Sequence, residues 1–207
     1  MRQPYWIIIF LFGVFAVTLL SEARADQEAS NVAYVATDEY GRCFAHSIPD
    51  AYFEPGGKTH IYAAGDELVL LQTFPWYAQR IYIACNASDG KGMSAPAIVQ
   101  MGPWPRGHKP NAETLAIAFH YNGKELARYS TLDIADGDPA NASCSVSHYT
   151  VIQEEEGLVR RGGDTLFRLV TIDGRRLTFS ATTGALIDTE QTSPVEFYGE
   201  CFGGRRE

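Results

Sequence analysis

The chain has 207 residues, a formal net charge of −8, 45% hydrophobic residues and four cysteines. This apolar content is too high for a disordered chain, and the 19 glycines follow no three-residue period, which excludes a collagen. The acidic balance argues against a nucleic-acid partner, which would require a clustered basic surface. We therefore expect a globular protein that does not bind nucleic acid.

The first 25 residues have the pattern of a signal peptide. Arg2 gives a positive start, residues 5–20 are apolar, and the Ala-Arg-Ala sequence at 23–25 is a small-x-small cleavage site. A transmembrane anchor is the weaker interpretation, because the apolar run is shorter than the ~20 residues that span a membrane. We predict cleavage after Ala25, no membrane span in the remaining chain, and a secreted or periplasmic protein.

The remaining chain, residues 26–207, is long enough to bury one self-sufficient core. We expect a single domain there. Residues 26–42 are polar and weakly patterned, which is typical of a loose N-terminal arm, and residues 203–207 have the composition of a frayed tail.

The cysteines indicate disulfides. An even number in an exported chain is typical of disulfide pairing, whereas zinc ligands usually include two cysteines two to four residues apart, and no such pair occurs. We favour Cys43–Cys85 with Cys144–Cys201, because one pair then lies on each side of the Pro/Gly-rich loop 102–110. Other pairings and free buried thiols are the alternatives.

Strand signals recur along the chain and helix signals are nearly absent. Residues 114–121 alternate between two faces, Asn122-Gly123 is a strong hairpin turn, and residues 124–129 form the return strand. A second hairpin through Asp173-Gly174 is expected from residues 165–172 and 175–180, and further strands from residues 32–36, 59–63, 67–73, 79–85, 96–101, 144–152, 185–189 and 195–198.

These short alternating strands predict an all-β fold, an antiparallel sandwich or barrel built from hairpins with little helix. The two hairpins share a pattern that could also be the trace of a repeat such as a propeller blade. A propeller needs roughly four or more four-stranded blades, which this chain supports poorly. A locally favoured turn used twice explains the pattern as well, so we retain the sandwich or barrel.

No common catalytic signature occurs, neither G-x-S-x-G, H-E-x-x-H, a P-loop nor G-x-G-x-x-G after a strand. The sequence therefore favours a protein that is not an enzyme. The alternative is an exported hydrolase whose site is assembled across strands, with His148 or His120 as base and Asp133 or Asp136 as orienter or metal ligand.

Residues 144–149 place two serines beside a histidine. If this segment is one strand, Ser145 and Ser147 point to the face opposite His148, so neither serine can hydrogen-bond its ring from a neighbouring position. We expect a structural role for His148.

The loop 133–141 collects Asp133, Asp136, Asp138 and Asn141, whose oxygens are of the type that calcium prefers. The EF-hand pattern is not met, since the glycine falls between two aspartates and no glutamate closes the loop. Such side chains also bond their own backbone in ordinary turns. We expect a turn and no cofactor, with calcium as the alternative.

Residues 102–110 hold three prolines and two glycines together with Trp104, Arg106 and His108. Prolines lower the entropy lost when a loop keeps one shape, and Trp and Arg are enriched at binding hot spots. A ligand-binding surface would combine these three side chains with Trp76 of a second aromatic turn. The interpretation that we favour for both tryptophans is burial, with Trp104 turned inward to plug one end of the barrel.

From these features we predict an exported all-β domain that binds a partner protein, a glycan or another small ligand. The third possibility, besides the hydrolase, is a structural envelope or matrix component whose exposed edge strand pairs with a neighbour. Asn86-Ala-Ser88 and Asn141-Ala-Ser143 are N-glycosylation sequons, relevant only in a host that glycosylates exported proteins.

Overall fold

The computed structural model describes residues 31–52, 56–193 and 201. The predicted signal peptide at 1–25, the strand expected at 195–198 and the tail at 203–207 lie outside these residues. No helix among the residues that the structure describes is long and apolar enough to cross a membrane.

The fold consists of three four-stranded antiparallel sheets that follow one another along the chain, in each of which neighbouring strands are consecutive in sequence. The first sheet contains β1 (Tyr34–Thr37), β2 (Cys43–Pro49), β3 (Gly57–Ala63) and β4 (Val69–Phe74). The second contains β5 (Ile81–Ser88), β6 (Ser94–Met101), β7 (Leu115–Tyr121) and β8 (Lys124–Ser130). The third contains β11 (Ile152–Arg161), β12 (Asp164–Thr171), β13 (Arg175–Ser180) and β14 (Leu186–Gln191).

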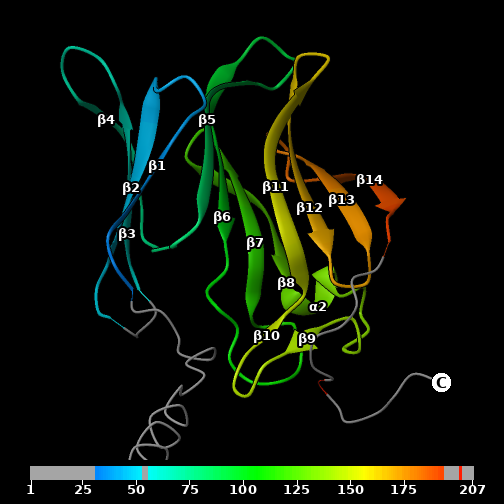
Figure 1. The fold of residues 1–207 in the computed structure, drawn as a ribbon. Helices are drawn as coiled ribbons and strands as arrows, with labels where there is room; N and C mark the ends of the chain where they lie inside the picture. The colour runs from blue at the N-terminus through cyan, green and yellow to red at the C-terminus, as the bar shows by residue number, and fades with distance from the viewer. Residues whose placement is uncertain (1–30, 53–55, 194–200, 202–207) are drawn as a thin grey trace, which may run out of the picture.

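Between the second and third sheets lie the short helix α2 (Thr131–Ile134) and a small hairpin of β9 (Ser143–Cys144) and β10 (Tyr149–Thr150). The three large sheets stand side by side in chain order (Figure 1). β5 contacts β1 and β2 on one side and β11 and β12 on the other. None of the described sheets closes on itself, so the all-β prediction is confirmed as a sandwich rather than a barrel.

The Asn-Gly hairpin forms as predicted between β7 and β8. Asn122 and Gly123 have φ values of 49° and 76°, as a two-residue turn matched to the strand twist requires. This hairpin supplies the third and fourth strands of its sheet, whereas the Asp173-Gly174 hairpin supplies the second and third strands of its own. The two turns also differ in backbone conformation: φ is positive at both Asn122 and Gly123, whereas of Asp173 and Gly174 only Gly174, at 82°, has a positive φ. The shared sequence pattern therefore marks two different turns at non-equivalent places.

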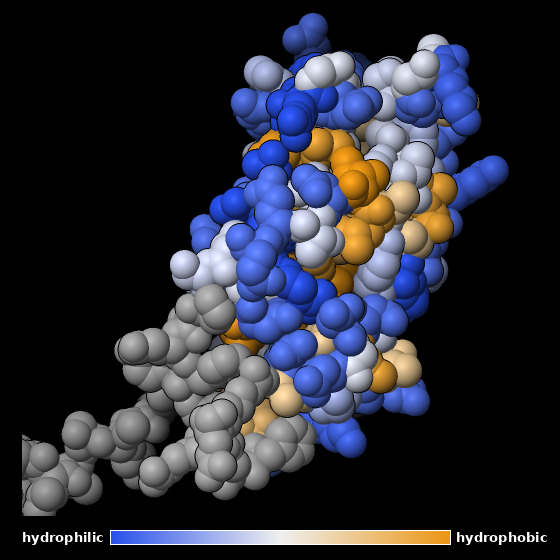
Figure 2. Space-filling model, turned by 90° about the vertical axis from the view of Figure 1, so that its right-hand side faces the viewer, coloured by the Kyte–Doolittle hydropathy of each residue, from blue (hydrophilic) through white to orange (hydrophobic). Residues whose placement is uncertain are grey.

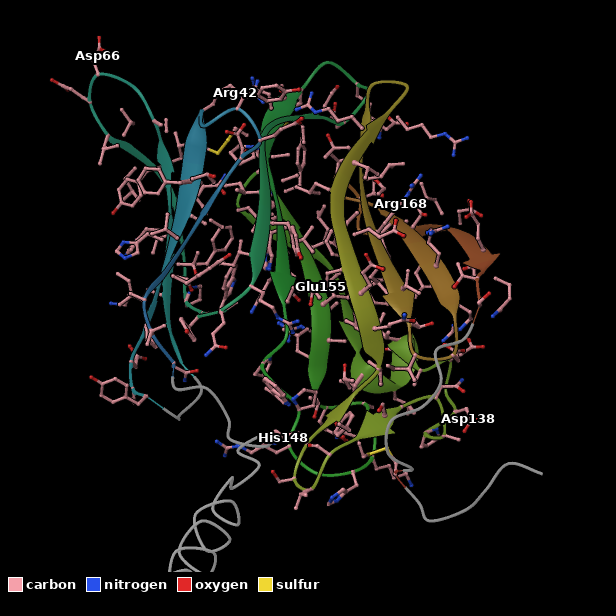
Figure 3. The ribbon with its side chains drawn as sticks, in the orientation of Figure 1. Arg42, Asp66, Asp138, His148, Glu155 and Arg168 are labelled. Atoms are coloured by element: carbon pink, nitrogen blue, oxygen red, sulfur yellow. A yellow bond between two sulfur atoms is a disulfide. The ribbon has the colours of Figure 1, made fainter. Side chains whose placement is uncertain are left out.

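Two strands were not predicted, for opposite reasons. β2 buries only small or polar side chains, Cys43, Ala45 and Ser47, so its sequence has little hydrophobic contrast between the two faces. β11 contains three consecutive glutamates, which a sequence pattern assigns to a solvated surface. One of them, Glu155 (Figure 3), instead bonds to Tyr82 of β5 and to Arg80, which precedes that strand.

The prediction of one strand over residues 144–152 is wrong. The chain turns back within it, because Tyr149 of β10 pairs with Cys144 of β9 and the amide of Ser145 donates to the carbonyl of His148. A new strand then begins at Ile152. Residues 34–37 of the expected N-terminal arm form β1 against β2.

Hydrophobic cores fill both spaces between the large sheets. Between the second and third sheets the Phe119 ring packs 5.2 Å from Phe179 and 6.2 Å from Phe167, with all three side chains fully buried. Between the first and second sheets the core includes Ile61 and Ile98. Each sheet therefore buries a face that it could not bury alone.

Both disulfides have the predicted pairing. Cys43–Cys85 joins β2 to β5, and so links the first sheet to the second. Cys144–Cys201 joins β9 to the C-terminal segment.

The outward face of the third sheet carries a network of ion pairs. The Arg176 guanidinium bonds the Glu156 carboxylate at 2.7 Å and the Glu190 carboxylate at 3.2 Å. Viewed from the β14 side, a band of hydrophobic residues lies among hydrophilic ones (Figure 2), and Leu186 and Ile187 of β14 are about half exposed.

Candidate ligand pocket

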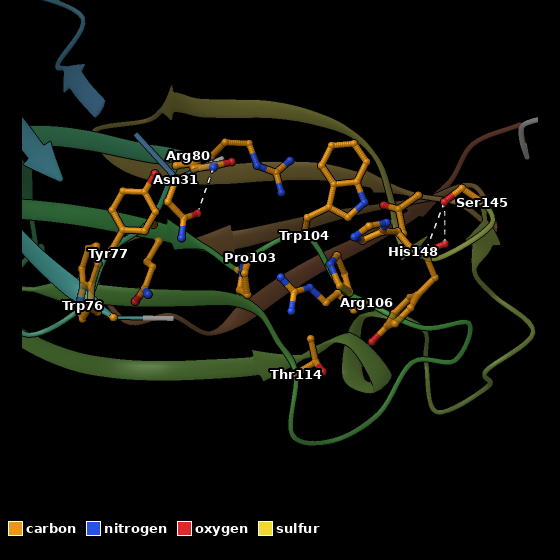
Figure 4. Close-up of a pocket in the computed structure, with 18 of the residues that line it drawn as sticks. Asn31, Trp76, Tyr77, Arg80, Pro103, Trp104, Arg106, Thr114, Ser145 and His148 are labelled. Atoms are coloured by element: carbon orange, nitrogen blue, oxygen red, sulfur yellow. Dashed lines mark hydrogen bonds between the residues drawn. The ribbon is translucent and has the colours of Figure 1, made fainter. Parts of the chain in front are cut away.

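A cavity of about 1000 Å³ is lined by three connecting segments, of which the β6–β7 loop and the β9–β10 hairpin lie lowest in Figure 1. Its walls come from the β4–β5 loop, the β6–β7 loop and the β9–β10 hairpin. We call it the basal pocket. Trp76 and Tyr77 lie at one end, Ser145 and His148 at the other, and Trp104 between them (Figure 4).

The β4–β5 loop holds Trp76 in a fixed position. The indole stacks on Phe74 with ring centroids 5.2 Å apart and lies 5.1 Å from the ring of His120. The Thr59 hydroxyl donates to the carbonyl of Trp76 at 2.8 Å, and the Ser47 hydroxyl accepts from the amide of Ala78 at 2.9 Å. The loop is therefore anchored to the first sheet, and Trp76 is partly buried.

Trp104 is not buried, and the expectation that it plugs one end of the fold is wrong: 51% of this residue is exposed. The β6–β7 loop attaches to the β9–β10 hairpin through its backbone, since the amide of Tyr149 donates to the carbonyl of Pro105 at 3.1 Å. Arg106 and His148 also form an isolated bridge. Because these backbone contacts hold the loop, the indole is left at the pocket, with its ring 5.5 Å from that of His148.

Three of the four predicted ligand-binding side chains, Trp76, Trp104 and Arg106, line this single cavity. His108 is placed elsewhere. Its ring lies 2.7 Å from the carbonyl of Val146 in the turn between β9 and β10, so it contacts the hairpin instead of the cavity.

The charge of the lining is opposite to that of the whole chain. Arg80 and Arg106 line the pocket, and no Asp or Glu does so among the residues described. Arg80 is held by an ion pair to Glu155 of β11, whose carboxylate also accepts from Tyr82 at 2.8 Å. Burial, and then this hydrogen bond, raise the pKa of the Tyr82 phenol. No sequence spacing indicates Arg80, because its partner is 75 residues away.

Amides and hydroxyls supply the rest of the polar lining. They include the side chains of Asn31, Gln79, Gln100, Thr114 and Tyr149. The Tyr149 phenol lies 2.9 Å from the hydroxyl of Thr131 at the start of α2. The pocket thus offers donors and acceptors beside its aromatic surfaces.

The local geometry at His148 differs from the expected one. Because residues 145–148 form a turn and not a strand, the Ser147 hydroxyl lies 2.9 Å from Nδ1 of His148. The Ser145 hydroxyl accepts from the His148 amide at 3.2 Å. The expectation that neither serine reaches the ring of His148 is therefore wrong for Ser147, whereas Ser145 contacts the backbone of His148.

The other candidate catalytic residues are not gathered at the basal pocket. Asp133 accepts from the amide and the hydroxyl of Ser130 in the capping box of α2. Asp136 lies 3.7 Å from the Arg175 guanidinium. His120 is buried between the first and second sheets, with Nε2 at 3.1 Å from Gln100.

In the loop 133–141 the remaining oxygen-bearing side chains bond the local backbone. Asp138 accepts from the amide of Ala140 at 2.9 Å, and the Asn141 amide donates to the carbonyl of Ala135 at 3.0 Å. These contacts are those of a turn. Within the described part of the chain, no group of three His, Cys, Asp or Glu side chains is arranged to hold a metal ion.

Comparisons with known proteins give little further information. No protein-family model matches the sequence, and no curated protein matches it. Among solved structures, the chain is similar to Sqt1 of Saccharomyces cerevisiae, with 12% identity and a TM-score of 0.44 over 80% of this chain. The match spans 39% of the Sqt1 chain.

Proposed function

We propose that this protein is an exported binding domain and that the basal pocket holds an acidic sugar, a short oligosaccharide that contains uronic acids. The observation that carries the proposal is the lining itself: two indoles and the Arg106 guanidinium in one cavity, with no Asp or Glu among its described lining residues. The volume of about 1000 Å³ is at the upper end of the range for pockets that enclose small ligands.

Each part of the lining matches one part of such a ligand. The exposed face of Trp104 gives a flat apolar surface for the C–H face of a sugar ring. Amide and hydroxyl side chains can pair with the ring hydroxyls. Arg106 can bind a carboxylate with two parallel hydrogen bonds, which is stronger and more specific than a neutral contact.

Export is supported by two separate features. The signal-peptide pattern of residues 1–25 directs a chain out of the cytoplasm. Disulfides such as Cys43–Cys85 and Cys144–Cys201 persist in oxidising compartments.

The test is calorimetric titration of the protein with trigalacturonate, and with maltotriose as a neutral sugar of the same length. We expect trigalacturonate to bind more tightly. Trp104→Ala should weaken its binding at least about tenfold with little change in melting temperature, because half of this residue is already exposed. Arg106→Gln should weaken the binding of trigalacturonate by about 10- to 100-fold, since hydrogen bonds to a charged group contribute about 1.5–3 kcal/mol. The binding of maltotriose should not change.

Tyr40→Ala is the matched control. Tyr40 is an aromatic residue, 60% exposed, that does not line the pocket. The proposal fails if the wild-type protein binds neither sugar, or if the Trp104 and Arg106 variants bind trigalacturonate as the wild type does. Equal affinity for both sugars would show that the pocket does not select for a carboxylate. A large drop in melting temperature for Trp104→Ala would show that this side chain belongs to the core.

A further inference from the structure

We propose that β4 is the surface through which this protein pairs with a second copy of itself, strand against strand. β4 is the last strand of the first sheet, and among the described residues it pairs only with β3. In Figure 1 this sheet lies at the left of the molecule. An edge of this kind presents backbone donors and acceptors that can pair with another chain.

The side chains of this segment are unusually apolar for an exposed edge. The exposed fractions are 63% for Leu68, 54% for Val69, 52% for Leu70 and 44% for Leu71. A strand that buries one face needs an apolar residue only at every second position. Four consecutive apolar residues are therefore exposed, and no contact among the described residues covers them.

The corresponding edges of the other two sheets are protected by charge. β8 carries Lys124, Glu125 and Arg128, and β14 carries Asp188 and Glu190. Charged side chains on an edge strand prevent pairing with another chain. β4, with the sequence VLLQTF, has no charged residue. The protection found on β8 and β14 is thus missing on β4.

The apolar surface continues from the edge onto the outward face of the first sheet. Leu70 pairs with Tyr62 in register, and the Tyr62 ring stacks on Phe44 at 5.2 Å. Val35 is 53% exposed on the same face. The apolar side chains of β4 are therefore continuous with others on the same face of the sheet.

A second copy is the partner that suits this edge. In a two-fold antiparallel pair, each β4 residue faces a residue of the other β4. A strand whose charges all had the same sign would therefore repel its copy. β4 avoids this repulsion because it is neutral. The nearest acidic residues precede it, with Asp66 at the tip of the β3–β4 loop (Figure 3). Since both copies carry a net charge of −8, a neutral edge is also where they approach with least repulsion.

The experiment measures the oligomeric state of the full chain by sedimentation velocity between about 1 and 100 μM, a range around common dissociation constants of dimers. We expect the wild-type protein to form a dimer. Leu70→Lys should raise the dissociation constant at least about tenfold, because it puts a charge on the apolar edge of each copy. Leu186→Lys on β14 is the control, since Leu186 is 46% exposed on an edge strand that already carries charge.

Hydrogen exchange distinguishes strand pairing from other contacts. In the wild-type dimer the exchange of β4 amides should slow as the protein concentration rises, and Leu70→Lys should abolish this change. A monomer over the whole range, a dimer that survives Leu70→Lys, or association that continues beyond a dimer would each overturn the proposal. None of these outcomes depends on sugar binding, so this test and that of the basal pocket fail separately.

Discussion

His120, which the sequence offered as a candidate catalytic base, is buried in the hydrophobic core. Its ring lies among Phe74 and Trp76, with centroids 5.1 Å away in both cases, and only 2% of the residue is exposed. Burial lowers the pKa of His120 to about 4, with smaller and opposing effects from Glu125 and Arg128. A histidine with so low a pKa is neutral at physiological pH and packs as part of the core.

This burial predicts a pH dependence of stability. The unfolded chain binds a proton at His120 near pH 6.5, while the folded chain does so only near pH 4, so the free energy of unfolding is highest above pH 6.5 and falls between these values. The full loss from this residue is about 3 kcal/mol. In His120→Gln, thermal melts at several pH values from 4 to 7 should show a flatter dependence than the wild type.

The quantity to compare is the slope of melting temperature against pH. The melting temperature itself also changes because the substitution alters the contact with Gln100. Parallel curves for the two proteins would contradict the role of His120.

At the scale of single elements, the approach of β6 to β7 explains why the Pro/Gly-rich loop begins with glycine. A Cβ atom on Gly102 would lie 1.8 Å from the carbonyl oxygen of Leu115, which is backbone and cannot move aside. The amide of Gly102 also donates to the carbonyl of Ala116 at 2.8 Å. The sequence indicates a loop here, but the reason for this glycine is a contact with the following strand.

Gly102→Ala should therefore lower the free energy of unfolding by at least about 2 kcal/mol, as expected for overpacking against a rigid neighbour. It should also displace Trp104 and weaken ligand binding at the basal pocket. Gly65→Ala is the matched control, because its nearest heavy atom would be 3.7 Å away. Urea denaturation of both variants measures the difference, and equal stabilities would show that β6 and β7 do not approach this closely.

Sequence patterns were reliable for elements whose information is local. The Asn122-Gly123 turn specifies its hairpin through the backbone preferences of two residues, and the strands on either side alternate clearly. Sequence patterns failed for β11, where Glu155 pairs with Arg80 of the β4–β5 loop and Glu156 with Arg176 of β13. They also failed for residues 144–149, where pairing between β9 and β10 overrides an alternating pattern.

At the scale of the whole molecule, the disulfides join parts that the sheets alone do not connect. Cys43–Cys85 closes a loop with a sequence separation of 42 residues and Cys144–Cys201 one of 57 residues. Loops of this length correspond to a stabilisation of about 4 kcal/mol each in the chain-entropy treatment.

The double variant Cys43→Ser/Cys85→Ser should therefore lower the free energy of unfolding by about 4 kcal/mol, because the unfolded chain regains the freedom that the crosslink removes. Chemical denaturation under non-reducing conditions measures this loss. Thiol titration of the unfolded, non-reduced wild-type protein should find no free thiol, because Cys43, Cys85, Cys144 and Cys201 are all in disulfides. Four reactive thiols would show that neither disulfide forms.

The sequence by itself determined the all-β class and most strand positions, because alternation and turn residues are local properties. It favoured the disulfide pairing that the structure shows without excluding the others. Composition also made Trp76, Trp104 and Arg106 candidates for ligand binding, although burial was the favoured interpretation of both tryptophans. Only the tertiary structure decided that Trp104 is exposed, that Arg80 joins Trp76 and Arg106 in one cavity, and that β4 is a neutral, unprotected edge. These features depend on contacts between segments far apart in the chain, and no local pattern encodes such distances.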